Sequence, residues 1–309
     1  MNGNESEKRL KLSVGPLLFG WPPSKIHDTW LMLAADSEAD ILYLGEVVCS
    51  KRCTYDAAWL ADLARELHQS GKEVVLSTLA MPTTEYELQF IRDIVAAAQE
   101  LDLRIEANDM AAVNIASEAK LAFVAGPHLN VYSHGTLQQL CRLGAGRVVL
   151  PPEIPAANIS AIIGDAGVEV EYFAHGRLPL TFSARCYTAR ARGLSKQECG
   201  RICFQTPDGL EMRTMDGGDF ATINGIQIMS HKPFTAINHL PALAEQGVQI
   251  LRLSPQADDI LGTIRHFRAV TDGVRSPEEA LREMSNGSPG SMFCNGYYFG
   301  RQGRLWIDG

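Results

Sequence analysis

A strand–helix–strand unit between residues 40 and 79 decides the fold: Asp40-Ile-Leu-Tyr-Leu44, then Ala57-Ala-Trp-Leu-Ala-Asp-Leu-Ala-Arg-Glu-Leu-His68, then Glu73-Val-Val-Leu-Ser-Thr-Leu79. The two outer runs are rich in Val, Ile and Leu, which is typical of parallel strands covered on both faces. The middle run repeats its apolar residues at helical spacing. Because parallel neighbours need a crossover connection, the segment predicts a βαβ unit.

The same alternation continues along most of the chain. Helical patterns separate many of the apolar runs, as in 87–101, 238–245 and 259–270. Eight strands are predicted, at Leu12–Phe19, Asp40–Leu44, Glu73–Leu79, Leu103–Ala107, Leu121–Ala125, Arg147–Leu150, Val168–Phe173 and Val248–Leu253. Eight strands alternating with helices predict an α/β fold, a (β/α)8 TIM-like barrel, with a doubly wound open sheet as the alternative.

The alternation breaks between residues 176 and 230, which we interpret as an insertion after strand 7 that bears cysteines and lies on the carboxyl-terminal face. We expect an extra strand pair there, with Ala221–Met229 as one member. The predicted division is an N-terminal arm at 1–11, a barrel domain at 12–275 that includes the insertion, and a linker and C-terminal tail at 276–309. Apolar residues of the tail must pack on the barrel or meet another chain, namely Met292, Phe293, Tyr297, Tyr298, Phe299, Leu305 and Trp306.

Composition narrows the class of protein. The 309 residues are 46% hydrophobic and 21% charged, as in ordinary soluble proteins. The net charge of −8 disfavours nucleic acid as a partner, because an acidic surface repels phosphates. No apolar run reaches the roughly 18 residues that a membrane helix needs, and Pro16 interrupts the segment that would otherwise suggest a signal peptide. We expect a cytoplasmic protein with no membrane span, whose seven cysteines are not disulfides.

Three cysteines lie in an Arg-rich stretch of the insertion, at Cys186, Cys199 and Cys203. The last two are four residues apart, so a helical turn would put both thiolates on one side. Thiolates favour zinc or iron–sulfur clusters, which usually take four ligands. The fourth ligand is Cys49 or Cys53, because the segment after the second strand also reaches the carboxyl-terminal face. Spacing decides neither this choice nor the metal.

Other residues receive structural or pocket roles. Cys141 and Cys294 are interpreted as core-filling cysteines, and Asp109 as a helix cap. Glu46 and His175 are candidates for a role in a substrate pocket, with no chemical step assigned to either. Polar residues at predicted strand ends should line that pocket at the barrel mouth, namely Glu46, Ser77, Glu106, Asn108, Asn130, Glu171, His175 and Arg252.

Several segments resemble a known family. Glu171-Tyr-Phe-Ala-His175-Gly176, followed by Ser183-Ala-Arg185-Cys186, resembles the collagenase-like unassigned peptidase family. The UbiV branch of that family is similar at Leu42-Tyr-Leu-Gly-Glu46-Val-Val-Cys49-Ser-Lys-Arg52, Arg252-Leu-Ser-Pro-Gln256 and Cys294-Asn-Gly-Tyr297. The resemblance extends from about residue 12 to residue 297.

The resemblance implies a 4Fe–4S cluster, with Cys49, Cys186, Cys199 and Cys203 as its ligands. Many relatives have a cysteine where this chain has Pro179, and Cys49 would replace it. Cys53 is then a spare. The branch implies a component of an oxygen-independent hydroxylase in anaerobic ubiquinone biosynthesis, working as a heterodimer with a UbiU-like protein. Its substrate would be a ubiquinone precursor, for which delivery by a lipid-binding protein is expected.

Two other functions remain open at this point. A peptidase is suggested by the name of the wider family, and Glu171 with His175 could form an acid–base pair. Against it, the chain has no His-Glu-x-x-His zinc motif and no Gly-x-Ser-x-Gly elbow. An RNA-modification factor is suggested because some relatives act on RNA, but the net charge of −8 weighs against it.

Overall fold

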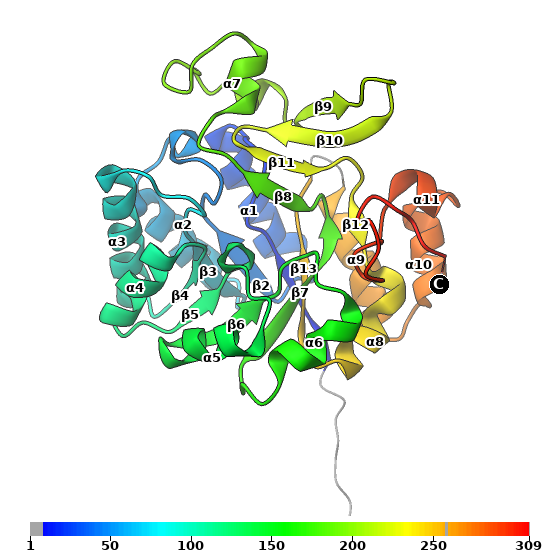
Figure 1. Ribbon diagram of the computed structural model, residues 1–309. Coiled ribbons are helices and arrows are strands. Elements are labelled where there is room, and N and C mark those ends of the chain that lie inside the picture. The colour runs from blue at the N-terminus through cyan, green and yellow to red at the C-terminus, as the bar shows by residue number, and fades with distance from the viewer. Residues whose placement is uncertain (1–8, 257–258, 309) are drawn as a thin grey trace, which may run out of the picture.

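Eight short parallel strands close into a barrel in the computed structural model, which describes residues 9–256 and 259–308 (Figure 1). Neighbouring strands follow the order β1-β2-β3-β4-β5-β6-β7-β13, and β13 pairs with β1 to close the ring. The barrel predicted from the sequence is therefore confirmed, and the open sheet is excluded. The strands are β1 (Lys11–Val14), β2 (Ile41–Leu44), β3 (Glu73–Ser77), β4 (Arg104–Ala107), β5 (Phe123–Ala125), β6 (Ala145–Val149), β7 (Glu169–Gly176) and β13 (Ile250–Leu253).

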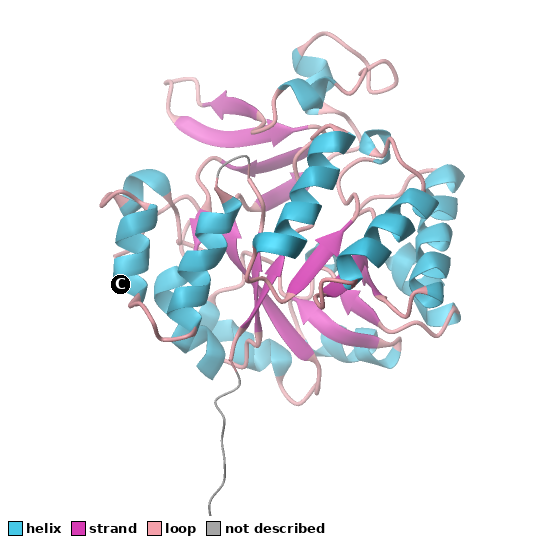
Figure 2. Ribbon diagram, turned by 180° about the vertical axis from the view of Figure 1, so that it is seen from behind, coloured by secondary structure: helices cyan, strands magenta, loops and turns pink. Residues whose placement is uncertain are grey.

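Helices surround the barrel and bury its outer surface (Figure 2). Helix α2 begins at Asp56, whose side chain accepts the N–H of Trp59 and so caps the first turn. Within the described residues, no helix combines the length and apolarity needed to cross a membrane. The barrel helices are α1 (Pro23–Asp36), α2 (Ala57–His68), α3 (Glu85–Glu100), α4 (Met110–Glu118), α5 (His134–Arg142), α6 (Ala156–Ile163), α8 (Leu240–Glu245) and α9 (Ile260–Thr271).

The core has two parts, because each strand alternates its side chains between the helices and the barrel interior. Apolar residues between strands and helices form the larger part. A small apolar cluster lies in the barrel interior, made of Ile41, Tyr43, Val75, Val124, Val149 and Ile250. Charged side chains are found on both sides of it: Arg147 with Glu73 and Glu169 toward the amino-terminal ends of the strands, and Arg252 with Glu106 and Glu171 toward the carboxyl-terminal ends.

The first strand is shorter than predicted. Strand β1 ends at Val14, because Gly15 adopts a φ of +93°. A side chain at Gly15 would also lie 2.7 Å from the carbonyl oxygen of Tyr43, so only glycine fits there. The residues that follow form a buried loop across the barrel mouth, with Leu17, Leu18, Phe19 and Trp21 almost fully buried. This loop lies between two candidate sites.

The insertion lies above the carboxyl-terminal face of the barrel, as expected (Figure 1). It forms a four-stranded antiparallel sheet in the order β8-β11-β10-β9. The prediction that Ala221–Met229 is a single strand was wrong: Gly225 has a φ of +71° and turns the chain between β10 and β11. Its elements are β8 (Pro179–Phe182), α7 (Tyr187–Ala191), the 3-10 turn η3 (Ile202–Gln205), β9 (Leu210–Arg213), β10 (Asp219–Asn224) and β11 (Gln227–Ser230).

The C-terminal range packs on the flank of its own barrel. Within it, Ser276 and Glu279 form a capping box at the start of α10 (Pro277–Met284), and α11 (Pro289–Met292) follows. The backbone of Cys294 forms an isolated β-bridge with Phe234 of the short strand β12 (Phe234–Thr235), and β12 pairs with β7. Most of the apolar tail residues therefore pack within this chain. Residues 1–8 of the expected arm lie outside the described residues, and the division into arm, barrel and tail stays a prediction.

Candidate functional site

Four cysteines from three separate segments line one cavity beside the barrel mouth. They are Cys49 after β2, Cys186 at the start of α7, and Cys199 and Cys203 around η3. These are the four cysteines to which the resemblance assigned a cluster. The fold brings them together because both the loop after β2 and the insertion leave the barrel at its carboxyl-terminal face.

Glu46 holds the loop that carries Cys49. Its carboxylate is buried and accepts the backbone N–H groups of Val48 at 2.7 Å and Cys49 at 3.0 Å. Burial raises the pKa of Glu46, while the nearby Arg52 and the two N–H groups oppose that rise. Glu46 thus positions Cys49 through the backbone.

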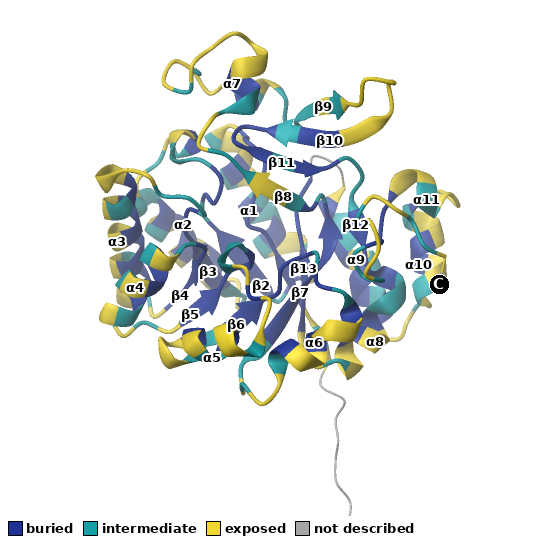
Figure 3. Ribbon diagram, in the orientation of Figure 1, coloured by how far each residue is buried: buried dark blue, intermediate teal, exposed yellow. Residues whose placement is uncertain are grey.

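The insertion cysteines are held by turns. At the start of α7, the sulfur of Cys186 accepts the N–H of Ala189 at 3.4 Å. Between Cys199 and Cys203, Arg201 adopts a φ of +56° and reverses the chain before η3. The pair therefore lies on a tight turn that leads into a 3-10 helix. The stretch at 192–195, which precedes the wall residue Lys196, is exposed (Figure 3).

A buried guanidinium that sequence reasoning missed lies beside the cavity. Arg52 is 2% exposed and donates to the carbonyl of Leu18 at 3.0 Å and that of Asn224 at 2.9 Å. A Cβ at Gly20 would lie 3.0 Å from the sulfur of Cys203 and 3.3 Å from Nε of Arg52, so the two groups are neighbours. Burial raises the pKa of Cys203 and Arg52 opposes that rise.

The cavity is rich in positive charge. Besides the thiols, its walls carry Lys51, Arg52, Lys196 and Arg201. Of the arginines expected near the ligands, Arg201 lines the cavity, whereas those at 185, 190 and 192 are exposed side chains that do not. Cations beside anionic thiolates compensate their charge.

The thiols around the cavity are not arranged to hold a single metal ion. In the described part of the chain, no three His, Cys, Asp or Glu side chains are close enough together to hold one metal ion. Four thiols around one space suit the larger iron–sulfur cubane, which takes four cysteine ligands. The space among them is about 10 Å³, so the walls of the cavity would have to move apart to hold a cluster.

The other cysteines lie elsewhere. Cys53 does not line the cavity, and Tyr55 hydrogen-bonds to its thiol. Cys141 packs against the core from α5, and Cys294 is fully buried beneath the tail. All seven cysteines are free thiols.

A second candidate site lies at the barrel mouth, where Arg252 is the central group. Its Nε donates to Glu171 at 2.7 Å and its Nη1 to Glu106 at 2.5 Å, and its guanidinium lies 3.9 Å from the ring centre of Tyr43. Burial alone would raise the pKa of Glu171, but Arg252 and Arg147 together hold it below its usual value. The interior charges are therefore paired.

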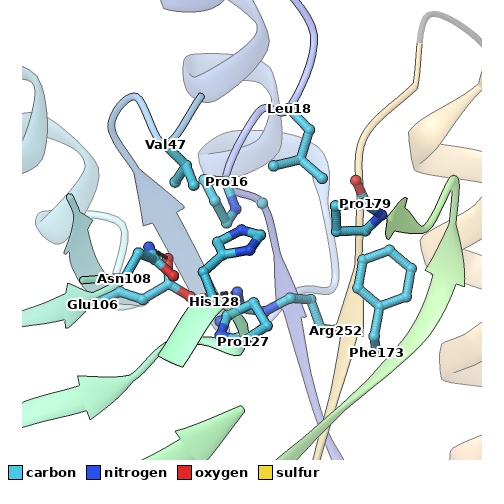
Figure 4. A pocket seen from close by; sticks show the side chains of 12 residues that line it. Pro16, Leu18, Val47, Glu106, Asn108, Pro127, His128, Phe173, Pro179 and Arg252 are labelled. Carbon is cyan, nitrogen blue, oxygen red and sulfur yellow. Dashed lines mark hydrogen bonds and ion pairs between the residues drawn. The ribbon is translucent and has the colours of Figure 1, made fainter. Parts of the chain in front are cut away.

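Above this network lies a small cavity, shown in Figure 4. Burial and the neighbouring Arg252 lower the pKa of its histidine, His128, to about 3. The walls combine apolar side chains with a few polar groups. They are formed by Gly15, Pro16, Leu18, Val47, Glu106, Asn108, Pro127, His128, Phe173, Pro179, Arg252 and Ser254.

Six of the eight predicted mouth residues divide into three groups. Glu106, Asn108 and Arg252 line the cavity, and Glu171 and Ser77 support it through Arg252 and Glu106. Asn130 lines a neighbouring groove. Asp109 caps α4, as expected.

His175 does not face the mouth. Its ring packs edge-on against Phe267 at 5.7 Å and Phe293 at 5.6 Å, and burial lowers its pKa to about 4. Glu171, in contrast, is bound to Arg252 inside the barrel. The two residues therefore lie in different environments, and the geometry gives no support to an acid–base pair between them. His128 and Arg52 are the site residues that sequence reasoning missed: no motif marks His128, and Arg52, although it ends the Cys49-Ser-Lys-Arg52 run, received no role.

The sequence profile of peptidase family U32 matches residues 29–308. The chain is a member of family U32. A collagenase of Porphyromonas gingivalis is 25% identical over 89% of this chain and 72% of its own length. An uncharacterized protease of Methanocaldococcus jannaschii is 26% identical over 80% of this chain and 63% of its own.

Two further relatives are similar over shorter stretches. The 23S rRNA 5-hydroxycytidine C2501 synthase of Escherichia coli is 24% identical over 50% of this chain and 24% of its own length. The tRNA hydroxylation protein P1 of Bacillus subtilis is 25% identical over 38% and 29%. Among solved structures, a U32 peptidase covers 84% of this chain and 97% of its own, with 13% identity and a TM-score of 0.45.

Proposed function

We propose that this U32 protein is UbiV-like: it carries a 4Fe–4S cluster on Cys49, Cys186, Cys199 and Cys203 and serves oxygen-independent hydroxylation of ubiquinone precursors. The observation that carries the proposal is the single cavity lined by these four thiols and by four cationic side chains. The names of two distant relatives, both of which hydroxylate RNA, support the hydroxylation chemistry. Seven free thiols suit the reducing cytoplasm.

The cluster would supply one-electron redox chemistry, and the chain's own residues define its surroundings. Glu46 holds the Cys49 loop in place through two backbone hydrogen bonds. The guanidinium of Arg52 is desolvated beside Cys203, where its positive charge favours the more negative, reduced state of a bound cluster.

The test is anaerobic purification of the full chain, followed by iron and sulfide analysis and visible absorption. We expect about four iron and four sulfide per chain, as one cubane contains. Alanine at Cys186 or Cys203 should abolish the brown chromophore. The matched controls Cys53→Ala and Cys141→Ala should retain it, since neither thiol lines the cavity. A chromophore that survives Cys186→Ala but not Cys53→Ala would contradict the ligand assignment.

The peptidase alternative is favoured by the collagenase among the relatives. The mouth gives it little support. Among the described residues the hydroxyl of Ser254 has no hydrogen-bond partner and therefore no base to activate it, and a histidine with a pKa of about 3 is a weak base. Gelatin hydrolysis by colourless protein, unchanged in the cysteine variants, would favour the peptidase.

We also propose a heterodimer with a UbiU-like protein, as the resemblance implies. The tail packs largely on its own barrel, although Met292 and Leu305 keep 43% and 38% of their surface exposed. Co-expression followed by size-exclusion chromatography tests the assembly. Separate elution of the two chains, with equal survival of the chromophore in air for the chain alone and with its partner, would contradict it.

A further inference from the structure

A further pocket lies between the insertion sheet and the C-terminal tail. It measures about 290 Å³, which is near the lower end of the volumes of small-molecule pockets. It shares no wall residue with the cysteine cavity or with the cavity at the barrel mouth. Its walls are formed by Leu178, Leu180, Asp219, Phe220, Ser230, His231, Lys232, Cys294, Tyr297, Gly303 and Arg304.

The body of this pocket is apolar. Leu178 and Leu180 lie at or next to the start of β8, Phe220 lies on β10, and Cys294 and Tyr297 belong to the tail. Burial raises the pKa of Cys294 to about 12, so its thiol is uncharged at neutral pH. Leu180 and Phe220 keep 44% and 52% of their surface exposed, so the apolar wall continues to the rim. A concave apolar surface of this kind favours a ligand with an apolar body.

Two cations on the walls have no carboxylate partner among the described residues. Lys232 uses one of its three N–H donors on a backbone carbonyl of α11, which leaves two for a ligand. Arg304 is exposed and forms no ion pair or hydrogen bond with another described side chain. The acidic wall residue is Asp219, whose oxygens lie 3.3 Å from His231 Nε2 and 3.7 Å from Arg213 Nε. Because its charge is already shared with these two groups, the pocket favours an anion.

We propose that this pocket binds an organic acid in which one carboxylate is joined to an apolar body. Lys232 and Arg304 bind the carboxylate, as cationic donors do through strong charge-assisted hydrogen bonds. The apolar body packs against Leu178, Phe220 and Tyr297. Open-chain and cyclic acids share this chemistry, so the experiment includes one of each. The inference goes beyond the proposed function and does not depend on it, since neither the thiols of the cysteine cavity nor the mouth residues contribute to this pocket.

The test compares octanoate with 1-octanol, which has the same alkyl chain without the carboxylate. Binding to the anaerobically purified full chain is measured at pH 7.5 by isothermal titration calorimetry. We expect octanoate to bind about tenfold more tightly, as hydrogen bonds to charged groups predict. Its affinity should fall at high salt, because part of the site is exposed to solvent. Cyclohexanecarboxylate, measured in parallel, shows whether a chain or a ring fits better.

Variants separate the carboxylate from the apolar body. Arg304→Gln should lower the affinity for octanoate about threefold, as expected of one exposed charge pair, and leave that for 1-octanol unchanged. Arg301→Gln is the matched control, because Arg301 is an exposed arginine of the same tail that does not line the pocket. Phe220→Ala should weaken both probes to a similar extent, since it removes apolar contact from each. Both side chains are exposed, so the fold should be retained.

The outcomes decide between an acid site and other occupants. If 1-octanol binds as tightly as octanoate, the acid site is overturned and the pocket is an apolar surface for a partner chain to cover. Displacement of octanoate by equimolar inorganic phosphate would also overturn it, because the apolar body would then add nothing. Equal octanoate affinity in iron-free and iron-loaded protein would support a site that is independent of the cluster. Iron and sulfide analysis of the same preparations tests the proposed function separately.

Discussion

Replacing Arg252 by leucine should be among the most damaging changes in the barrel. The substitution removes the hydrogen bonds to Glu171 at 2.7 Å and Glu106 at 2.5 Å, together with the contact on Tyr43. Glu106 and Glu171 are both fully buried. Arg252→Leu therefore leaves two carboxylates inside the barrel without their shared counter-charge.

The expected cost follows from that burial. Breaking a buried ion pair by removing one partner costs about 3–5 kcal/mol. Unfolding entropy is about 2.1 cal/mol/K per residue, which for 309 residues gives about 0.65 kcal/mol/K. The melting temperature should then fall by about 5–8 °C, measured by calorimetry under anaerobic conditions. The exposed Arg265 on α9 is the matched control, and Arg265→Leu should change stability by less than about 0.5 kcal/mol.

The pH dependence of this destabilisation tests whether the unpaired carboxylates cause it. In the parent protein, Arg252 helps to hold the pKa of Glu171 below its usual value. Without Arg252, burial dominates and raises that pKa, so the carboxyl can be neutral at mildly acidic pH. The stability difference between Arg252→Leu and the parent should therefore be largest at pH 7.5 and smaller at pH 5, as the variant's carboxyls become protonated.

A compensating variant completes the test. Arg252→Leu combined with Glu106→Gln and Glu171→Gln removes the uncompensated charge, and replacing a whole buried ionic group is often nearly neutral. We expect the triple variant to recover at least half of the lost stability. A single variant within 1 kcal/mol of the parent, or a triple variant no more stable than the single one, would refute the account of a charge-balanced interior.

Three further outcomes are expected. Arg52→Met should lower the cluster's reduction potential in an EPR-monitored titration and cost about 1–3 kcal/mol, whereas Arg52→Lys should restore part of the potential. Burial raises the pKa of Glu169, but the guanidinium groups of Arg147 and Arg104 outweigh it and lower that pKa to about 2. The stabilisation by the ionised carboxylate should therefore be present at neutral pH and be lost as pH falls from about 4.5 toward 2. In acid titrations, Glu169→Gln should flatten this loss. Gly126→Ala should cost about 1–3 kcal/mol in denaturant melts, because its Cβ would lie 2.0 Å from Asn108 Oδ1, whereas Gly135→Ala, with open space around it, should not destabilise.

The barrel could be predicted from sequence because its signals are local and repeated. Each strand is a short apolar run, and the helices between them keep a regular period. The errors arose where a glycine controls the backbone. Gly15 ends the first strand early, and Gly225 divides one predicted strand into a hairpin. A positive φ depends on the tertiary fold at each site, so hydrophobic periodicity cannot predict it.

The candidate sites were predictable only where a motif marked them. Cys186, Cys199 and Cys203 stood out because thiols in a polar, Arg-rich loop have no reason to fill a core, whereas Cys49 was chosen only through the family resemblance. Arg52 ends the quoted Cys49-Ser-Lys-Arg52 run, but its burial could not be foreseen, because an arginine in a loop is usually solvated and this one is buried by carbonyl groups at Leu18 and Asn224 far away in sequence. His128 was also missed, because no sequence motif marks it.

The two candidate sites are neighbours, and Arg52 links them through its hydrogen bond to the carbonyl of Leu18. Leu18 lines the mouth cavity with its side chain, while its carbonyl accepts from Arg52, whose other side lies against Cys203. Val47 also lines the mouth, two residues before Cys49. A redox group held by the thiols would therefore lie one layer of residues from a ligand in the mouth. Because Arg52 is buried and hydrogen-bonded on both sides, displacing it at one site must disturb the other. Arg52, which is almost fully buried, therefore connects the cysteine cavity with the loop that lines the mouth.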